Sequence, residues 1–77
     1  MAQAILFFGS LTDITSVSSF VGDDLMDTDT VKIFLEEKYP ALKQSKYFIA
    51  VNQIMIQQNT TLTPGDTVAL MPPFSGG

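Results

Sequence analysis

The residues best suited to chemistry stand at the end of the sequence, where Pro72-Pro73-Phe74-Ser75 leads into Gly76-Gly77. Two prolines stiffen a chain and hold it extended, so these last residues could reach ~20 Å beyond a folded body. Because glycine has no side chain, the terminal carboxylate could enter a narrow channel and remain open to nucleophiles. The tail therefore predicts one reactive group, the α-carboxylate of Gly77, presented to the active site of another protein. A frayed end without a function is the alternative interpretation.

The rest of the sequence offers no catalytic residues of the usual kinds. It contains no cysteine and no histidine, and therefore no thiol nucleophile, no imidazole for acid–base catalysis and no soft metal ligand. We expect no metal site, no cofactor bound by the chain itself and no autonomous enzyme. A carboxylate is a poor electrophile, so the catalyst that activates it must be a partner.

The charge of the chain excludes two further classes of partner. Four lysines and no arginine stand against eight acidic residues, giving a net charge of −4. A nucleic-acid-binding protein needs a basic face, and an anionic membrane surface would repel this chain. Without an apolar stretch of ~18 residues or a basic leader, the expected location is the cytoplasm. Four aspartates in one loop either steer basic partners or, more simply, cap a helix: Asp23, Asp24, Asp27 and Asp29.

The elements that must position the tail follow from the hydrophobic pattern. We expect strands over 4–8, 15–21, 47–51, 54–56 and 67–71, because these runs are apolar or β-prone and are bounded by turn residues. Val31, Phe34, Leu35 and Tyr39 recur at helical spacing, with Asp29 or Thr30 as a cap, and Pro40 ends this helix. Tight turns are expected at Asn52-Gln53 and over 63–66. The order β-β-α-β-β-β predicts an α+β protein with a β-grasp (ubiquitin-like) fold, a mixed sheet crossed by one main helix. Residues 1–71 would form the single domain and 72–77 the extended tail, with strands 4–8 and 67–71 side by side at the centre of the sheet.

The continuous apolar run at 4–8 indicates a strand that is covered on both faces. One helix can cover only one face of a small sheet. The other face, which carries either Phe7 or Phe8, is therefore open to a second protein or is covered by loops of the same chain.

Several blocks of the sequence resemble one known family. The tail Met71-Pro72-Pro73-Phe74-Ser75-Gly76-Gly77 is similar to that of the small subunit of molybdopterin synthase, a ubiquitin-like sulfur carrier. Further similar blocks fall in the same order and at similar spacing along the whole chain: 5–8, 50–53 and 62–69. Gly-Gly alone is a weak signal, whereas Pro-Pro-x-x-Gly-Gly after a β-grasp-length chain is a strong one.

This resemblance implies a definite chemistry. An E1-like adenylating enzyme would use ATP to convert the carboxylate of Gly77 to an acyl-adenylate. Sulfur from a persulfide donor would then replace AMP and leave a thiocarboxylate. The tail, through Pro72, Pro73, Phe74, Ser75 and Gly76, would enter the active site of the large synthase subunit, and sulfur would pass to cyclic pyranopterin monophosphate in molybdenum cofactor biosynthesis. The chain would thus be the sulfur-carrier subunit of a sulfurtransferase complex, a heterotetramer with two carriers, and not an enzyme alone.

The resemblance also suggests where the large subunit docks. Leu70 and Met71 stand where the family commonly has two aromatic residues before Pro-Pro, and we assign Phe7, Leu70 and Met71 to the partner interface. Ordinary core packing is the alternative for these residues. An Arg-Glu pair that the family often has after the first strand is absent here, where Leu11-Thr12-Asp13-Ile14 follows.

Two other functions remain open for the same tail. Sulfur carriage for thiamine, cysteine or tRNA thiolation uses the same thiocarboxylate, and the Pro-Pro pair only favours the molybdopterin pathway. A ubiquitin-like protein modifier would instead join Gly77 to lysines of target proteins. A β-grasp interaction module with an idle tail is a third class.

Overall fold

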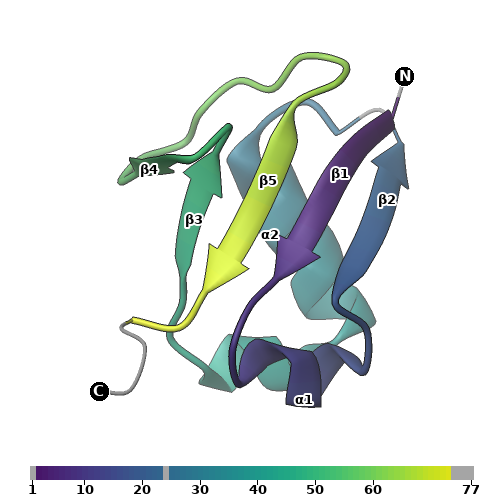
Figure 1. Cartoon of the computed structure of the whole chain (residues 1–77), viewed down its shortest axis with the longest axis vertical. Helices are drawn as coiled ribbons and strands as arrows, with labels where there is room; N and C mark the ends of the chain where they lie inside the picture. Colours follow the sequence, from purple (N-terminus) through teal and green to yellow (C-terminus); the bar gives the residue numbers. More distant parts are fainter. Residues whose placement is uncertain (1, 24, 74–77) are drawn as a thin grey trace.

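The strands of the chain form one mixed, five-stranded sheet in the computed structural model, which describes residues 2–23 and 25–73 (Figure 1). They are β1 (Ala2–Phe7), β2 (Ser19–Asp23), β3 (Phe48–Val51), β4 (Ile54–Ile56) and β5 (Thr67–Met71), in the spatial order β2-β1-β5-β3-β4. β1 and β5 run parallel, and the other neighbouring pairs are antiparallel. The predicted β-grasp sheet, with its first and last strands side by side, is confirmed.

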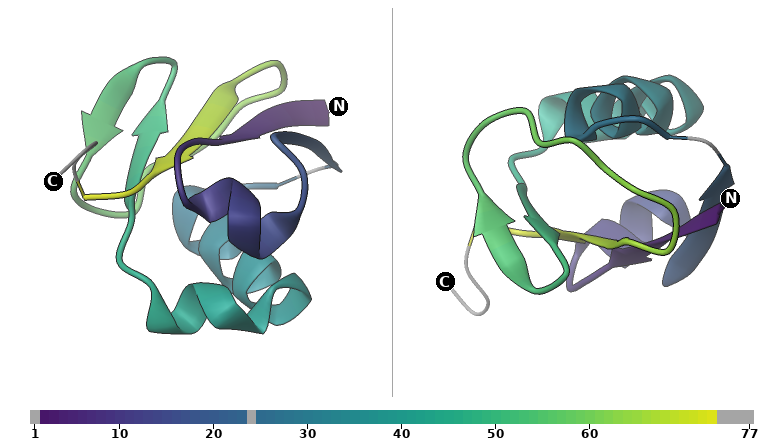
Figure 2. Two further views of the ribbon diagram at one scale, coloured as in Figure 1. Left: turned by 60° about the horizontal axis from the view of Figure 1, so that its bottom comes forward. Right: turned by 90° about the horizontal axis from the view of Figure 1, so that it is seen from above.

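One long helix, α2 (Thr28–Lys38), crosses a single face of this sheet (Figures 1 and 2). Val31 and Leu35 are fully buried on the side of α2 that faces the strands. The helix starts two residues earlier than Thr30, because the carboxylate of Asp27 accepts a 2.8 Å hydrogen bond from the backbone N–H of Thr30 and so acts as the cap. The predicted caps, Asp29 and Thr30, are therefore wrong.

Two short helices were not expected from the sequence. α1 (Leu11–Thr15) follows β1, and a 3₁₀ helix, η1 (Pro40–Gln44), follows α2. The strand expected over 15–21 is wrong in its first half, because Thr15 ends α1 and β2 begins only at Ser19. Leu11 and Thr15, four residues apart on one helical face, are both buried, so burial rather than length stabilises α1.

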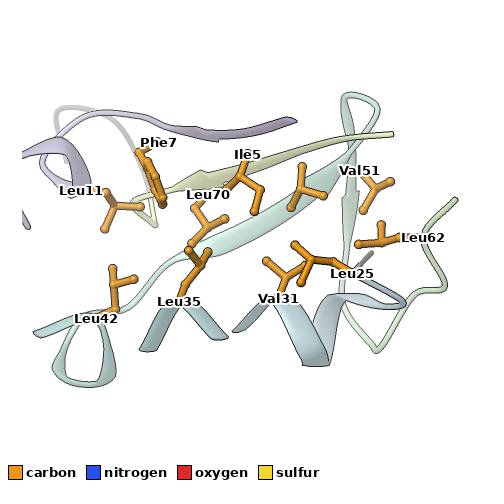
Figure 3. Close-up of a cluster of buried hydrophobic side chains, with 11 residues drawn as sticks. Ile5, Phe7, Leu11, Leu25, Val31, Leu35, Leu42, Val51, Leu62 and Leu70 are labelled. Carbon is orange, nitrogen blue, oxygen red and sulfur yellow. The ribbon is translucent and has the colours of Figure 1, made fainter. Parts of the chain in front are cut away.

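The core lies between the sheet and the helices (Figure 3). Its side chains come from alternate positions of β1 and β5, from the end of β3 and from the inner sides of the helices, with contributions from the loops before α2 and before β5. They are Ile5, Phe7, Leu11, Leu25, Val31, Leu35, Leu42, Val51, Leu62, Val68 and Leu70. Because side chains alternate across a strand, the residues between these positions on β1 and β5 point to the other face of the sheet.

Both predicted turns are confirmed. Asn52 and Gln53 have positive φ angles of 51° and 72°, as the two central residues of a type I′ hairpin require. Gly65 has φ +89° and the N–H of Asp66 donates to the carbonyl of Thr63 at 3.1 Å, as in a type II turn. Among the described residues, no helix is both long and apolar enough to cross a membrane.

Candidate functional site

The tail leaves the body from the central strand of the sheet. β5 ends at Met71, Pro72 is half-buried and Pro73 is exposed. β5 has strands on both sides, β1 and β3, so the base of the tail continues from a strand that is paired along both edges. Phe74, Ser75, Gly76 and Gly77, which the sequence analysis assigns to the reactive tail, lie outside the described residues.

An apolar face of the sheet adjoins the base of the tail. It is the face opposite α2, which is turned towards the viewer in Figure 1. We call it the outward face and define it by Leu6, Phe8, Ala50, Ala69 and Met71. Together with Asn52, Gln53 and Thr67, these residues line a shallow hollow of about 500 Å³. Phe8 is 47% exposed, and together with the other apolar residues of the outward face it forms a contiguous apolar surface, which is more informative than a single exposed side chain.

The register of the strands explains the shape of this hollow. Ala69 pairs with Leu6 on one side and with Ala50 on the other, so small side chains form the floor. Met71 pairs with Phe48, and Met55 pairs with Ala50; both Phe48 and Met55 are exposed at the rim. An apolar depression with a larger apolar rim suits the insertion of an apolar side chain from another protein.

The structure corrects part of the predicted interface. Phe7 is only 3% exposed and Leu70 is fully buried, so both belong to the core and cannot contact a partner. Met71 does point to the outward face. Adjacent residues of a strand lie on opposite faces, so Leu70 and Met71 could not both have been surface residues. Of the two residues left open for the free face of the sheet, Phe8 lies on it and Phe7 does not. The prediction did not name Leu6, Ala50 and Ala69, and the period of two along each strand was the signal that could have found them.

Polar side chains fix the end of the hollow that is remote from the tail. Asn52 donates to Asp66 at 2.9 Å and accepts from the backbone N–H of Thr67 at 3.0 Å, while Thr63 donates its N–H to Asp66 at 2.8 Å. The backbone hydrogen bond from Thr63, and then the one from the Asn52 side chain, lower the pKa of Asp66 below its usual value. These bonds tie the β3–β4 turn to the start of β5.

The structure gives a role to two of the four aspartates in and around the loop before α2. Asp27 caps α2, and hydrogen bonds from the Thr30 side chain and backbone, then from Asn59, lower its pKa. Asp29 lies in the first turn of the helix, where a negative charge is favourable. Steering of basic partners by this loop stays a prediction.

The described part of the chain contains no cluster of three or more acidic, cysteine or histidine residues that could hold a metal ion. What the described residues do offer is an apolar surface beside the strand from which the tail leaves.

Comparison with protein families gives one match over most of the chain. Residues 5–77 match the model of the ThiS family. The sequence is also similar to the molybdopterin synthase sulfur carrier subunit of Haemophilus influenzae, with 28% identity over 95% of this chain and 96% of that protein.

Comparison with solved structures agrees with the observed fold. Subunits 1 and 2 of the molybdopterin-converting factor of Helicobacter pylori were solved as a complex, and a chain of that complex is matched with a TM-score of 0.76 and 29% identity over the full length of both chains. Small archaeal modifier protein 1 of Methanosarcina acetivorans is similar with a TM-score of 0.82 and 23% identity, over 99% of this chain and 96% of that one. At that identity the second likeness shows the shared fold alone.

Proposed function

Because the chain belongs to the ThiS family, we propose that it is a sulfur carrier which holds sulfur as a thiocarboxylate on Gly77. Its proposed pathway is molybdenum cofactor biosynthesis, where it would serve as the small subunit of molybdopterin synthase. The observation that carries the proposal is that the family match extends through residue 77 and so includes Gly76-Gly77. A chain without cysteine needs another atom to hold sulfur, and the α-carboxylate of Gly77 is the candidate.

The proposed loading takes place in two steps on partner enzymes. A carboxylate oxygen of Gly77 attacks the α-phosphate of ATP on an adenylating enzyme, which forms an acyl-adenylate and releases pyrophosphate. The terminal sulfur of a persulfide then attacks the acyl carbon and expels AMP. A thiol reduces the resulting acyl disulfide, which leaves the thiocarboxylate on Gly77 and a disulfide on the donor side.

The proposed delivery takes place on the large synthase subunit. The outward face docks on that subunit, and the tail carries the thiocarboxylate into its active site, where sulfur passes to cyclic pyranopterin monophosphate. A dithiolene contains two sulfur atoms, so two loaded carriers are consumed for each product, in agreement with a heterotetramer of two large and two small subunits. The similarity to a chain of the Helicobacter pylori complex of subunits 1 and 2 supports the proposal that the partner is a large synthase subunit.

Reconstitution tests this function. The thiocarboxylate form of the chain, the large subunit of molybdopterin synthase and cyclic pyranopterin monophosphate should together yield molybdopterin, with one product for two carriers consumed. The same chain with an unmodified carboxylate is the control and should yield none. A loaded carrier that docks on the large subunit but transfers no sulfur would refute the molybdopterin assignment and leave thiamine, cysteine or tRNA thiolation as the pathway.

A protein modifier is the second candidate, because an acyl-adenylate at Gly77 is also open to attack by a lysine amine, which would form an amide bond and expel AMP. Its fold is shared with small archaeal modifier protein 1. Denaturing blots of cell lysate against the chain separate the two functions. A carrier gives a single band at the size of the free chain, whereas a modifier gives a ladder of covalent conjugates.

A further inference from the structure

The pairing of β1 with β5 stops where the tail begins, and the cause is Pro72. The backbone N–H of Phe8 donates to the carbonyl of Leu70 at 3.0 Å. In a parallel ladder the next bond would run from the N–H of residue 72 to the carbonyl of Phe8. Proline has no N–H, and the Phe8 carbonyl instead accepts from the N–H of Leu11 at 3.2 Å. The base of the tail therefore has no ladder bond at Pro72 and needs another contact to fix its direction.

That contact is with Gly9, the residue at which β1 turns into α1. Gly9 has φ +57°, a left-handed conformation that glycine adopts without strain. A Cβ built on Gly9 would lie 2.9 Å from Cγ and 3.4 Å from Cδ of Pro72. The proline ring thus occupies the space that any side chain at position 9 would fill.

We propose that Gly9 is a positioning residue for the tail. Because Gly9 has no side chain, the Pro72 ring packs directly beside its α-carbon, and this contact sets the direction in which the tail with its thiocarboxylate leaves the body. This inference rests on the proposed function. It goes beyond that function because it assigns a role in presenting Gly77 to a residue from the opposite end of the sequence.

Because the tail is long, a small rotation at Pro72 produces a large displacement of its end. Five residues follow Pro72, and fully extended they would span at most ~17 Å. A rotation of about 10° at Pro72 would then move the end of the tail by roughly 3 Å. Misplacement of a reacting atom by ~1 Å can lower a rate ~100-fold, so a small shift of the proline ring is enough to impair transfer.

The structure offers a matched control for the test. Gly65 also has a positive φ angle, +89°, but a Cβ at this position would meet no atom within 4 Å. Gly9→Ala and Gly65→Ala therefore both place a side chain at a positive φ angle, and only Gly9→Ala displaces Pro72. Pro72→Ala removes the ring carbons with which the new methyl group would clash, so the double variant Gly9→Ala/Pro72→Ala tests the contact directly.

The assay is carrier-dependent exchange of labelled pyrophosphate into ATP by the adenylating enzyme, with the full-length chain varied in concentration. Gly9→Ala should lower kcat by ten- to a hundredfold with KM unchanged, because it changes the direction of the tail and none of the exposed side chains of the body. Gly65→Ala should stay within about twofold of the unsubstituted chain. Adding Gly9→Ala to Pro72→Ala should lower the rate no further, whereas independent effects would multiply.

Other results overturn the inference. A rise in KM with kcat unchanged would show that Gly9 contributes to binding the enzyme and not to the direction of the tail. Equal losses of kcat in Gly9→Ala and Gly65→Ala would show that Gly9 matters only for the stability of the fold. The absence of a nuclear Overhauser contact between Gly9 Hα and the Pro72 ring protons in the free chain would remove its basis independently of any enzyme. If the unsubstituted chain supports no exchange, the proposed function fails first and the positioning role fails with it.

Discussion

Replacing Phe8 by alanine tests whether the outward face binds the large subunit. Phe8 is 47% exposed. A phenylalanine side chain presents ~200 Å², so a partner that covers it removes about 90 Å² from water. At ~25 cal/mol per Å² this area contributes ~2 kcal/mol, and its loss should weaken binding about thirtyfold.

The assay is calorimetric titration of the full-length chain into the large subunit of molybdopterin synthase. Ile33→Ala is the matched control, because Ile33 is 60% exposed but lies on α2, which covers the opposite face of the sheet. Circular dichroism establishes that both variants are folded at the temperature of the titration. An unchanged Kd for Phe8→Ala, or an equal loss for Ile33→Ala, would show that the partner does not bind the outward face.

Three further predictions concern the stability of the body. Phe7→Ala, one residue before Phe8, should lower the free energy of unfolding by ~3–5 kcal/mol in urea titrations, because Phe7 is a core residue; a loss below 1 kcal/mol would contradict its burial. Asp27→Ala removes the cap that bonds Thr30 and should lower the midpoint of thermal unfolding by roughly 4–8 °C; an unchanged midpoint would mean that the cap is dispensable. The pKa of Asp66 is lowered from its ordinary value in the folded state, chiefly by the hydrogen bond from the backbone N–H of Thr63. Its contribution to stability is therefore complete above that value and is lost as the pH falls through the lower folded pKa. Asp66→Asn should flatten this acid dependence, and an unchanged pH profile would show that Asp66 makes no such contribution.

The fold could be predicted from the sequence because its signals are local. Asn52-Gln53 and Pro64-Gly65 select their turns through their own backbone preferences, and Pro40 ends α2 wherever the rest of the chain lies. The short helix α1 was not predicted, because five residues form no stable helix alone. It exists because the fold buries Leu11 and Thr15, and that burial depends on residues distant in the sequence.

The site was predicted less completely than the fold, for a related reason. A run such as Ile5-Leu6-Phe7-Phe8 is apolar on both faces, so the residues themselves do not show which side faces α2. That choice depends on the register with β5, where Phe7 lies beside the buried Leu70. The contact between Gly9 and Pro72 joins opposite ends of the sequence, and only the parallel pairing of β1 with β5 brings the two together.

The central claim is that Gly77 carries the sulfur, and tandem mass spectrometry tests it most directly. After incubation with ATP, the adenylating enzyme and a persulfide donor, the C-terminal fragment that contains Gly77 should gain the mass difference between sulfur and oxygen. The change should be absent without ATP and in a chain extended by one residue after Gly77. A C-terminal fragment of unchanged mass in the complete reaction, or sulfur located elsewhere in the chain, would contradict the account.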